Sequence, residues 1–181
     1  MSASAVTPRQ RRKLDIAKRV RRASDAAERC KIVGCRQPTT ASAARGLNRL
    51  YCRRHEDQHA RHGSYFKLSY GATAINPYRR AALVWIQSSD ALPGVLEALE
   101  GVRNLYRSAG AVSPAFRLAG KKPDERSRVA LARLREAEIA PELLLAAWPA
   151  VQAMHLDDPQ PERRPENRIV QVTNIVHRMA S

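Results

Sequence analysis

The chain has 181 residues, which is enough for one moderate domain or for a small domain joined to a helical one. It contains no apolar run near the ~20 residues of a membrane span, and no apolar segment of a secretory signal accompanies its basic N-terminus. The formal net charge is +15, and residues 1–80 carry +14 of it, a distribution typical of a protein whose basic half binds a polyanion.

Residues 1–29 are predicted to form a basic arm that is mostly helical. Thr7 can cap a helix that begins at Pro8, and helix-forming sequence continues to Cys30. The apolar stripe of this helix is narrow, so most of its surface is cationic and solvated. It could lie along phosphates, and the alternative is a charged helix that contacts nothing. The residues expected to contact phosphate without reading sequence are Arg11, Arg12, Lys18, Arg19, Arg21 and Arg22.

All three cysteines lie in the next segment, residues 30–63, in the pattern C-x4-C-x16-C-x2-H. This two-plus-two spacing is that of a structural zinc site, and the segment has few large apolar residues, so Zn2+ is the expected source of its order. His59 is the chief alternative for the fourth ligand, because it lies one helical turn beyond the preferred histidine. Cysteines with metal-site spacing indicate a reducing cytoplasm. The predicted ligands are Cys30, Cys35, Cys52 and His55.

A turn and a helix are expected to present these ligands. Gly34 allows a tight turn before Cys35, and residues 47–62 have a helical pattern that Gly63 ends. Arginines on or beside that helix are better candidates for base or groove contact than those of the arm, because the metal would fix their direction. These candidates are Arg45, Arg49, Arg53 and Arg54, with Arg61 as a further nucleic-acid contact on the same helix.

The window CKIVGCRQPTTASAARGLNRLYCRRHEDQHARHG resembles a short zinc motif common in phage and mobile-element proteins, where it often accompanies HNH-type homing endonucleases and DNA-binding proteins. Residues 47–51 depart from it, because the motif is usually tighter there. The resemblance implies a treble-clef-like knuckle and helix that bind zinc, in a protein that binds DNA. The matching residues are Cys30, Gly34, Cys35, Arg45, Gly46, Cys52, His55 and Gly63.

Residues 64–80 are predicted to be a connector. Its aromatic residues, Tyr65, Phe66 and Tyr70, are interleaved with basic ones. They could stack on the bases of a single strand, but core packing that joins the basic module to the rest of the chain is favoured.

Residues 81–181 are predicted to form an α-helical domain, so the whole fold is expected to be mainly α. Residues 165–181 are ambiguous between helix and strand because of their β-branched residues. Helices are expected to begin near Pro77, Asp90, Pro114, Pro123 and Pro141. The candidate core is Leu83, Val84, Trp85, Ile86, Leu96, Leu99, Val102, Leu105, Val129, Leu131, Leu134, Ile139, Leu143, Leu144, Leu145, Trp148 and Val151.

These patterns favour a zinc-stabilised nucleic-acid-binding protein over an enzyme. DNA is preferred to RNA as the partner, and the protein would be a regulator or accessory factor of a phage or mobile element, with the helical domain serving a homodimer or a protein partner. The first alternative is a non-catalytic subunit of a nucleoprotein assembly. The second, an HNH-like nuclease, lacks the expected histidine and asparagine spacing. Asp157 and Asp158 lie close to His155 in the sequence, but this arrangement is more typical of a solvated turn than of a metal site.

Overall fold

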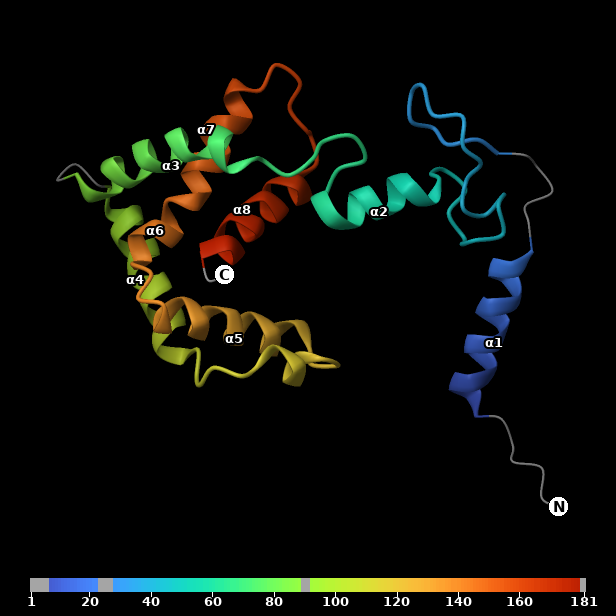
Figure 1. Cartoon of the computed structure of the whole chain (residues 1–181), viewed down its shortest axis with the longest axis horizontal. Coiled ribbons are helices and arrows are strands. Elements are labelled where there is room, and N and C mark those ends of the chain that lie inside the picture. Colours follow the sequence, from blue (N-terminus) through green and yellow to red (C-terminus); the bar gives the residue numbers. More distant parts are fainter. Residues whose placement is uncertain (1–6, 23–27, 89–91, 180–181) are drawn as a thin grey trace. The chain divides into compact units, whose positions relative to one another are not determined.

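The computed structural model describes residues 7–22, 28–88 and 92–179 (Figure 1). Within these residues the fold is α-helical with no sheet, which confirms the predicted mainly α fold. The chain divides into two compact units, Met1–Lys67 and Leu68–Ser181, which are described separately below. No helix in the described part of the chain is long and apolar enough to cross a bilayer.

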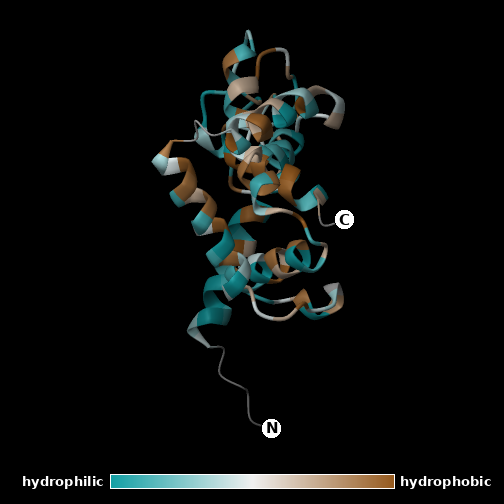
Figure 2. Cartoon of the chain, turned by 90° about the vertical axis from the view of Figure 1, so that its left-hand side faces the viewer, coloured by the Kyte–Doolittle hydropathy of each residue, from teal (hydrophilic) through white to brown (hydrophobic). Residues whose placement is uncertain are grey.

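The first unit begins with helix α1 (Pro8–Arg21), as predicted. Thr7 Oγ1 accepts a hydrogen bond from the backbone N–H of Gln10, whose side chain accepts one from the N–H of Thr7, so that the two residues form a capping box. No residue of α1 is buried, and its ribbon is mostly hydrophilic (Figure 2). The helix ends at Arg21, before the predicted end near Cys30, and residues 23–27 lie outside the described part of the chain.

The prediction that residues 47–62 form one helix is wrong for its first third. Helix α2 is Arg53–His62, with Cys52 as its N-cap and Gly63 in the left-handed conformation at its C-cap. The preceding residues instead pair with distant backbone: Leu50 accepts a hydrogen bond from the N–H of Lys31, and Tyr51 accepts one from the N–H of Thr40. The side chain of Asn48 also accepts bonds from the N–H groups of Leu50 and Tyr51, an Asx turn that competes with helix.

The second unit contains the remaining helices. The last segment is a helix and not a strand, which resolves the ambiguity caused by its β-branched residues. Helix α3 packs on α7, α7 packs on α8, and α4 packs on α5 and α6 (Figure 1). The bounds are α3 (Ala72–Gln87), α4 (Pro93–Ser108), the 3-10 turn η1 (Ala115–Leu118), α5 (Pro123–Glu136), α6 (Pro141–Leu145), α7 (Ala147–Asp157) and α8 (Pro165–Met179).

Three helix boundaries in this unit differ from the predicted ones. Helix α3 begins at Ala72, five residues before Pro77, which lies inside the helix. The single helix expected after Pro141 is divided at Ala146 into α6 and α7, because Pro149 has no N–H to continue the hydrogen-bond ladder. Asp90, the predicted cap of α4, lies outside the described residues, and the helix begins at Pro93.

Two apolar clusters hold the helical unit together. The larger joins α3, α7 and α8, and its small alanines allow α3 and α7 to approach closely. The smaller joins Tyr106 of α4, Leu134 of α5 and Leu144 of α6. The buried residues of the larger cluster are Ile75, Ala82, Ile86, Ala146, Ala147, Ala150, Val151 and Ile175.

Part of the predicted core is wrong. Val84, Trp85, Leu96, Leu105 and Trp148 are between 43% and 68% exposed. Hydrophobic periodicity placed these five residues in the core, but the buried residues of the larger cluster are alanine, isoleucine and valine. Large apolar side chains therefore remain on the surface of the helical unit.

Candidate metal centre

Cys30 and Cys35 flank a tight backbone turn. The N–H of Cys35 donates to the carbonyl of Ile32, and Gly34 has a φ of +79°, which residues with a side chain adopt at a cost. The N–H of Cys30 donates to the carbonyl of Gln37, and Arg29 and Pro38 form an antiparallel bridge. These bonds fold the segment back on itself, so that both thiols point to the same side.

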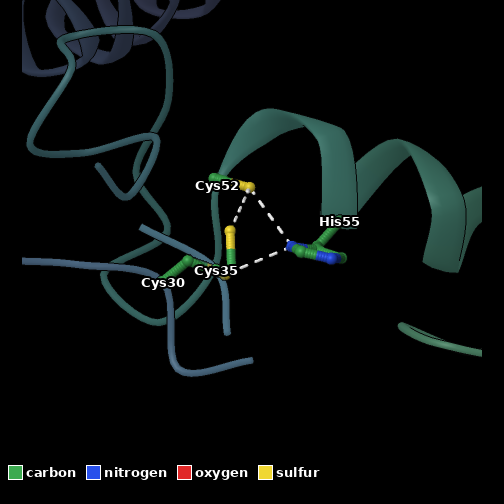
Figure 3. Close-up of side chains that lie close together, drawn as sticks. All are labelled: Cys30, Cys35, Cys52 and His55. Carbon is green, nitrogen blue, oxygen red and sulfur yellow. Dashed lines mark hydrogen bonds between the residues drawn. The ribbon is translucent and has the colours of Figure 1, made fainter. Parts of the chain in front are cut away.

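Cys52 and His55 come from the start of α2. As the N-cap and the third residue of the helix, they are separated by less than one turn and point in the same direction. Backbone bonds from the 39–51 loop to the knuckle bring this helix end next to the first two cysteines. Figure 3 shows the four side chains converging from the knuckle and from the helix.

The four side chains form a compact Cys3His group whose ligand atoms all lie within 4.8 Å of one another. His55 Nδ1 is 3.3 Å from both Cys30 Sγ and Cys52 Sγ, and Cys35 Sγ is 3.9 Å from Cys52 Sγ (Figure 3). Cys30 and Cys52 are 6% and 3% exposed. Such a group could hold a metal ion, and it is the one His, Cys, Asp and Glu group of this kind in the described residues.

The thiols of the cluster do not share one pKa. Burial raises the pKa of Cys30, but hydrogen bonds from the backbone of Ile32 and Cys52 and from the neighbouring thiols outweigh it, and the pKa lies below its ordinary value. Burial raises the pKa of Cys52, and the nearby thiols of Cys35 and Cys30 add to this increase. One thiolate thus disfavours the next, so a fully deprotonated cluster needs a cation among the sulfurs.

His59, the alternative fourth ligand, is not part of this group. Its ring stacks on Tyr65 with centroids 4.4 Å apart, and Tyr65 stacks on Tyr51 at 3.8 Å. The three rings connect α2 to the chain on either side of it. No stacking role was predicted for Tyr51, and Tyr65 was assigned to a connector; an aromatic residue directly before the third cysteine was the available signal.

The arginines predicted to contact nucleic acid are all exposed. Those of α1 lie along a helix without buried residues, where Arg19 forms an ion pair of 2.9 Å with Asp15. Three from residues 30–63 come together: Arg45, Arg53 and Arg54 line a cavity of about 240 Å³ that Cys52 also borders. Arg49 and Arg61 do not line it.

Two other predicted features are also placed by the structure. His155, Asp157 and Asp158 do not form a metal-binding group, and Asp157 accepts a hydrogen bond of 2.8 Å from Tyr78 Oη. Among the connector aromatics, Phe66 is 56% exposed, whereas Tyr70 packs against the larger apolar cluster of the helical unit.

Comparison of the chain with protein-family models, with curated proteins and with solved structures gave no match. The resemblance of residues 30–63 to a zinc motif is therefore supported by the Cys3His group alone, and it identifies no family.

Proposed function

We propose that the first unit is a zinc-stabilised nucleic-acid-binding module and that the protein has a binding role and not a catalytic one. The donor set supports the choice of zinc. Bonds of ~2.3 Å to sulfur and ~2.0–2.1 Å to nitrogen at tetrahedral angles separate the ligand atoms by about 3.5–3.8 Å. Three of the observed separations, 3.3, 3.3 and 3.9 Å, are close to these values, and all the ligand atoms lie within 4.8 Å of one another. Four protein ligands complete a structural site, whereas catalytic zinc keeps an open position.

The nucleic-acid partner is inferred from the cavity lined by Arg45, Arg53 and Arg54. Three guanidinium groups around one hollow attract phosphate, and their side chains start from backbone that the metal would hold rigid. The exposed basic residues of α1 would add contacts without sequence information. DNA is preferred to RNA because the motif that residues 30–63 resemble accompanies DNA-binding proteins, and a regulator or accessory factor of a phage or mobile element is the role this implies.

The test compares two matched double variants on duplex DNA. Arg45→Gln/Arg54→Gln removes two charges from the cavity and keeps Arg53, which forms an ion pair of 3.1 Å with Asp57. Arg11→Gln/Arg12→Gln removes two charges from α1. Binding is titrated at several salt concentrations, both to a duplex selected from random sequences for binding the parent protein and to random DNA. Arg126→Gln/Arg128→Gln on α5 is the control for net charge.

We expect the α1 variant to lose affinity equally on both DNAs, with the slope of log K against log salt reduced by about 2. The cavity variant should lose more on the selected sequence than on random DNA. Equal losses on both DNAs for both variants would contradict the separate roles. An effect of the α5 variant as large as theirs would contradict the location of the interface in the first unit.

The alternative function, a non-catalytic subunit of a nucleoprotein assembly, is favoured by the exposed apolar side chains of the helical unit. Trp85 and Trp148 are 43% and 48% exposed, and Val84 and Leu156 are 68% and 82% exposed. Exposed side chains of this size suit a protein partner. Zinc content of one equivalent without measurable DNA affinity of the isolated chain would favour this alternative.

A further inference from the structure

A cavity of about 320 Å³ lies between α3 and α6 in the helical unit. Its polar wall is formed by Asn76, Arg79 and Arg80 of α3, and its apolar lining is formed by Leu83 of the same helix with Leu143 and Ala146. Its volume is at the lower end of the range for small-molecule sites, about 300–1,000 Å³. Its mixed lining is also typical of such sites, where a few polar groups orient a ligand against apolar walls.

Arg79 is the distinctive residue of this cavity. Its Nη1 donates a hydrogen bond of 3.3 Å to Asn76 Oδ1, while its Nε is buried and lacks a hydrogen-bond partner within the described residues. Burial lowers the pKa of Arg79, and no carboxylate among the residues that the structure describes opposes this effect. A partly desolvated guanidinium without an anion is unfavourable. An anion in the cavity would lower that cost through its charge, without reaching the enclosed Nε itself.

The chemistry of the polar wall selects among anions. Arg79 and Arg80 together supply two positive charges and the planar N–H donor sets that fit phosphate oxygens. A phosphate monoester carries about −1.5 to −2 charges at pH 7 and three acceptor oxygens. A carboxylate or a phosphodiester carries a single charge, so it would leave one guanidinium of the pair uncompensated.

We propose that the cavity between α3 and α6 is a binding site for a phosphate monoester group, held by Arg79 and Arg80, with Leu83, Leu143 and Ala146 facing the remainder of the ligand. The site lies wholly in the helical unit and does not depend on the metal cluster. The group has two possible sources, a phosphorylated small molecule or the terminal phosphate of a nucleic-acid strand.

The first experiment titrates inorganic phosphate into the full-length protein at constant ionic strength and follows the arginine Nε–H signals by 15N NMR. The Arg79 signal should shift with saturation in phosphate and much less in acetate. Arg79→Gln, which keeps side-chain N–H donors but removes the charge, should weaken phosphate binding about tenfold or more, and Arg80→Gln should weaken it as well. Arg126→Gln on the exposed face of α5 is the matched control and should bind as the parent does.

Several results would overturn the proposal. These are an Arg79 signal that phosphate does not shift, equal responses to acetate and phosphate, and a loss in Arg126→Gln as large as in Arg79→Gln. Arg79→Met separates binding from folding. Because it removes an uncompensated, partly buried charge, this variant should unfold at the same temperature as the parent or higher while losing phosphate. If the Arg79 variants unfold, Arg80→Gln alone decides, since Arg80 is exposed.

The second experiment identifies the source of the phosphate. Adenosine monophosphate is compared with adenosine, and an oligonucleotide with a 5′-phosphate is compared with the same oligonucleotide ending in a hydroxyl. In at least one pair, the phosphorylated member should bind more tightly than the other and should depend on Arg79. That pair identifies the source of the phosphate. Affinity should also rise as pH increases through about 6, because the dianion forms there. Equal binding within both pairs would refute a monoester site.

Discussion

Residues 28–67 and residues 68–179 bury different kinds of side chain. In the first segment the described buried residues are small, polar or sulfur-containing: Cys30, Thr39, Thr40, Ala41, Cys52 and Ser64, with Gly63. In the second they include Ile75, Leu134, Val151 and Ile175, each at most 4% exposed. The first unit therefore has little apolar surface to stabilise its turns, whereas the second is held by ordinary helix packing. Under the proposed zinc binding, the first unit would depend on a metal for its order, whereas the second would not.

Removing the metal should have the largest effect and should affect one unit only. Apparent zinc affinities of structural sites are about 10–16 kcal/mol, more than a module without an apolar core can replace. Chelation, or Cys52→Ser, should unfold residues 28–67 and leave the helical unit folded. Limited proteolysis with mass spectrometry locates the cleavages. His59→Ala is the matched histidine control for His55→Ala and should retain one equivalent of zinc. If residues 30–62 of Cys52→Ser resist proteolysis as they do in the parent protein, the first unit does not depend on a metal for its order.

The converse experiment targets the apolar core of the helical unit. Leu134 is 1% exposed and packs with Tyr106 and Leu144, so Leu134→Ala should lower the free energy of unfolding of this unit by about 2–5 kcal/mol. Leu96, 57% exposed, is the matched control, and its alanine variant should change stability by less than about 0.5 kcal/mol. Denaturant unfolding measures both. Zinc content should be unchanged in each, and its loss in Leu134→Ala would show that the two units fold together.

A smaller effect is expected from the buried amide that fixes the start of the helical unit. Gln171 Oε1 accepts a hydrogen bond of 2.8 Å from the N–H of Tyr70, and its Nε2 donates one of 3.1 Å to the carbonyl of Leu68. Gln171→Ala leaves these groups unpaired and should cost about 1–3 kcal/mol. Faster hydrogen exchange of the Tyr70 amide would report the loss. Gln87→Ala, at the exposed end of α3, should show neither change.

The smallest effect concerns α1, which differs from the rest of its unit and from the helical unit because it has no buried residue and no metal ligand. Isolated helices of its length are marginally stable in water, so the capping box contributes a large share of its order. Thr7→Ala should reduce the stability of this helix by about 1 kcal/mol, measured as lower helicity of the α1 signals by NMR. Arg9→Ala should have no comparable effect, and an unchanged α1 in Thr7→Ala would show that tertiary contacts hold it.

The candidate metal centre could be predicted well because its information is local. Spacing alone found the four residues that the structure brings together, and helix starts at Pro8, Pro123 and Pro141 followed from the preference of proline for the first turn. The stretch before Cys52 could not be predicted in this way. Its backbone bonds to Lys31 and Thr40 join residues far apart in the sequence, and these bonds override its local helix preference.

The packing of the helical unit could not be predicted from local information in the same way. Hydrophobic periodicity located its helices but did not show which faces meet, so Trp85 and Trp148 were assigned to a core that alanines form instead. The predicted start of helix α3 was too far along the chain, because Pro77 is a strong signal for a helix start. The helix instead tolerates this proline at its sixth position. Tertiary contacts decided both outcomes, and a single sequence does not contain them in readable form.

The separation of 3.9 Å between the sulfurs of Cys35 and Cys52 has a consequence for the redox chemistry of the protein. Thiolates bound to a metal are shielded from oxidants, but two thiols this close can each lose a proton and an electron to an oxidant and form a disulfide. The odd number of cysteines would then leave Cys30 unpaired, with too few thiolates to hold zinc. A purified sample that has lost its metal in air would therefore need a reductant before zinc could restore it.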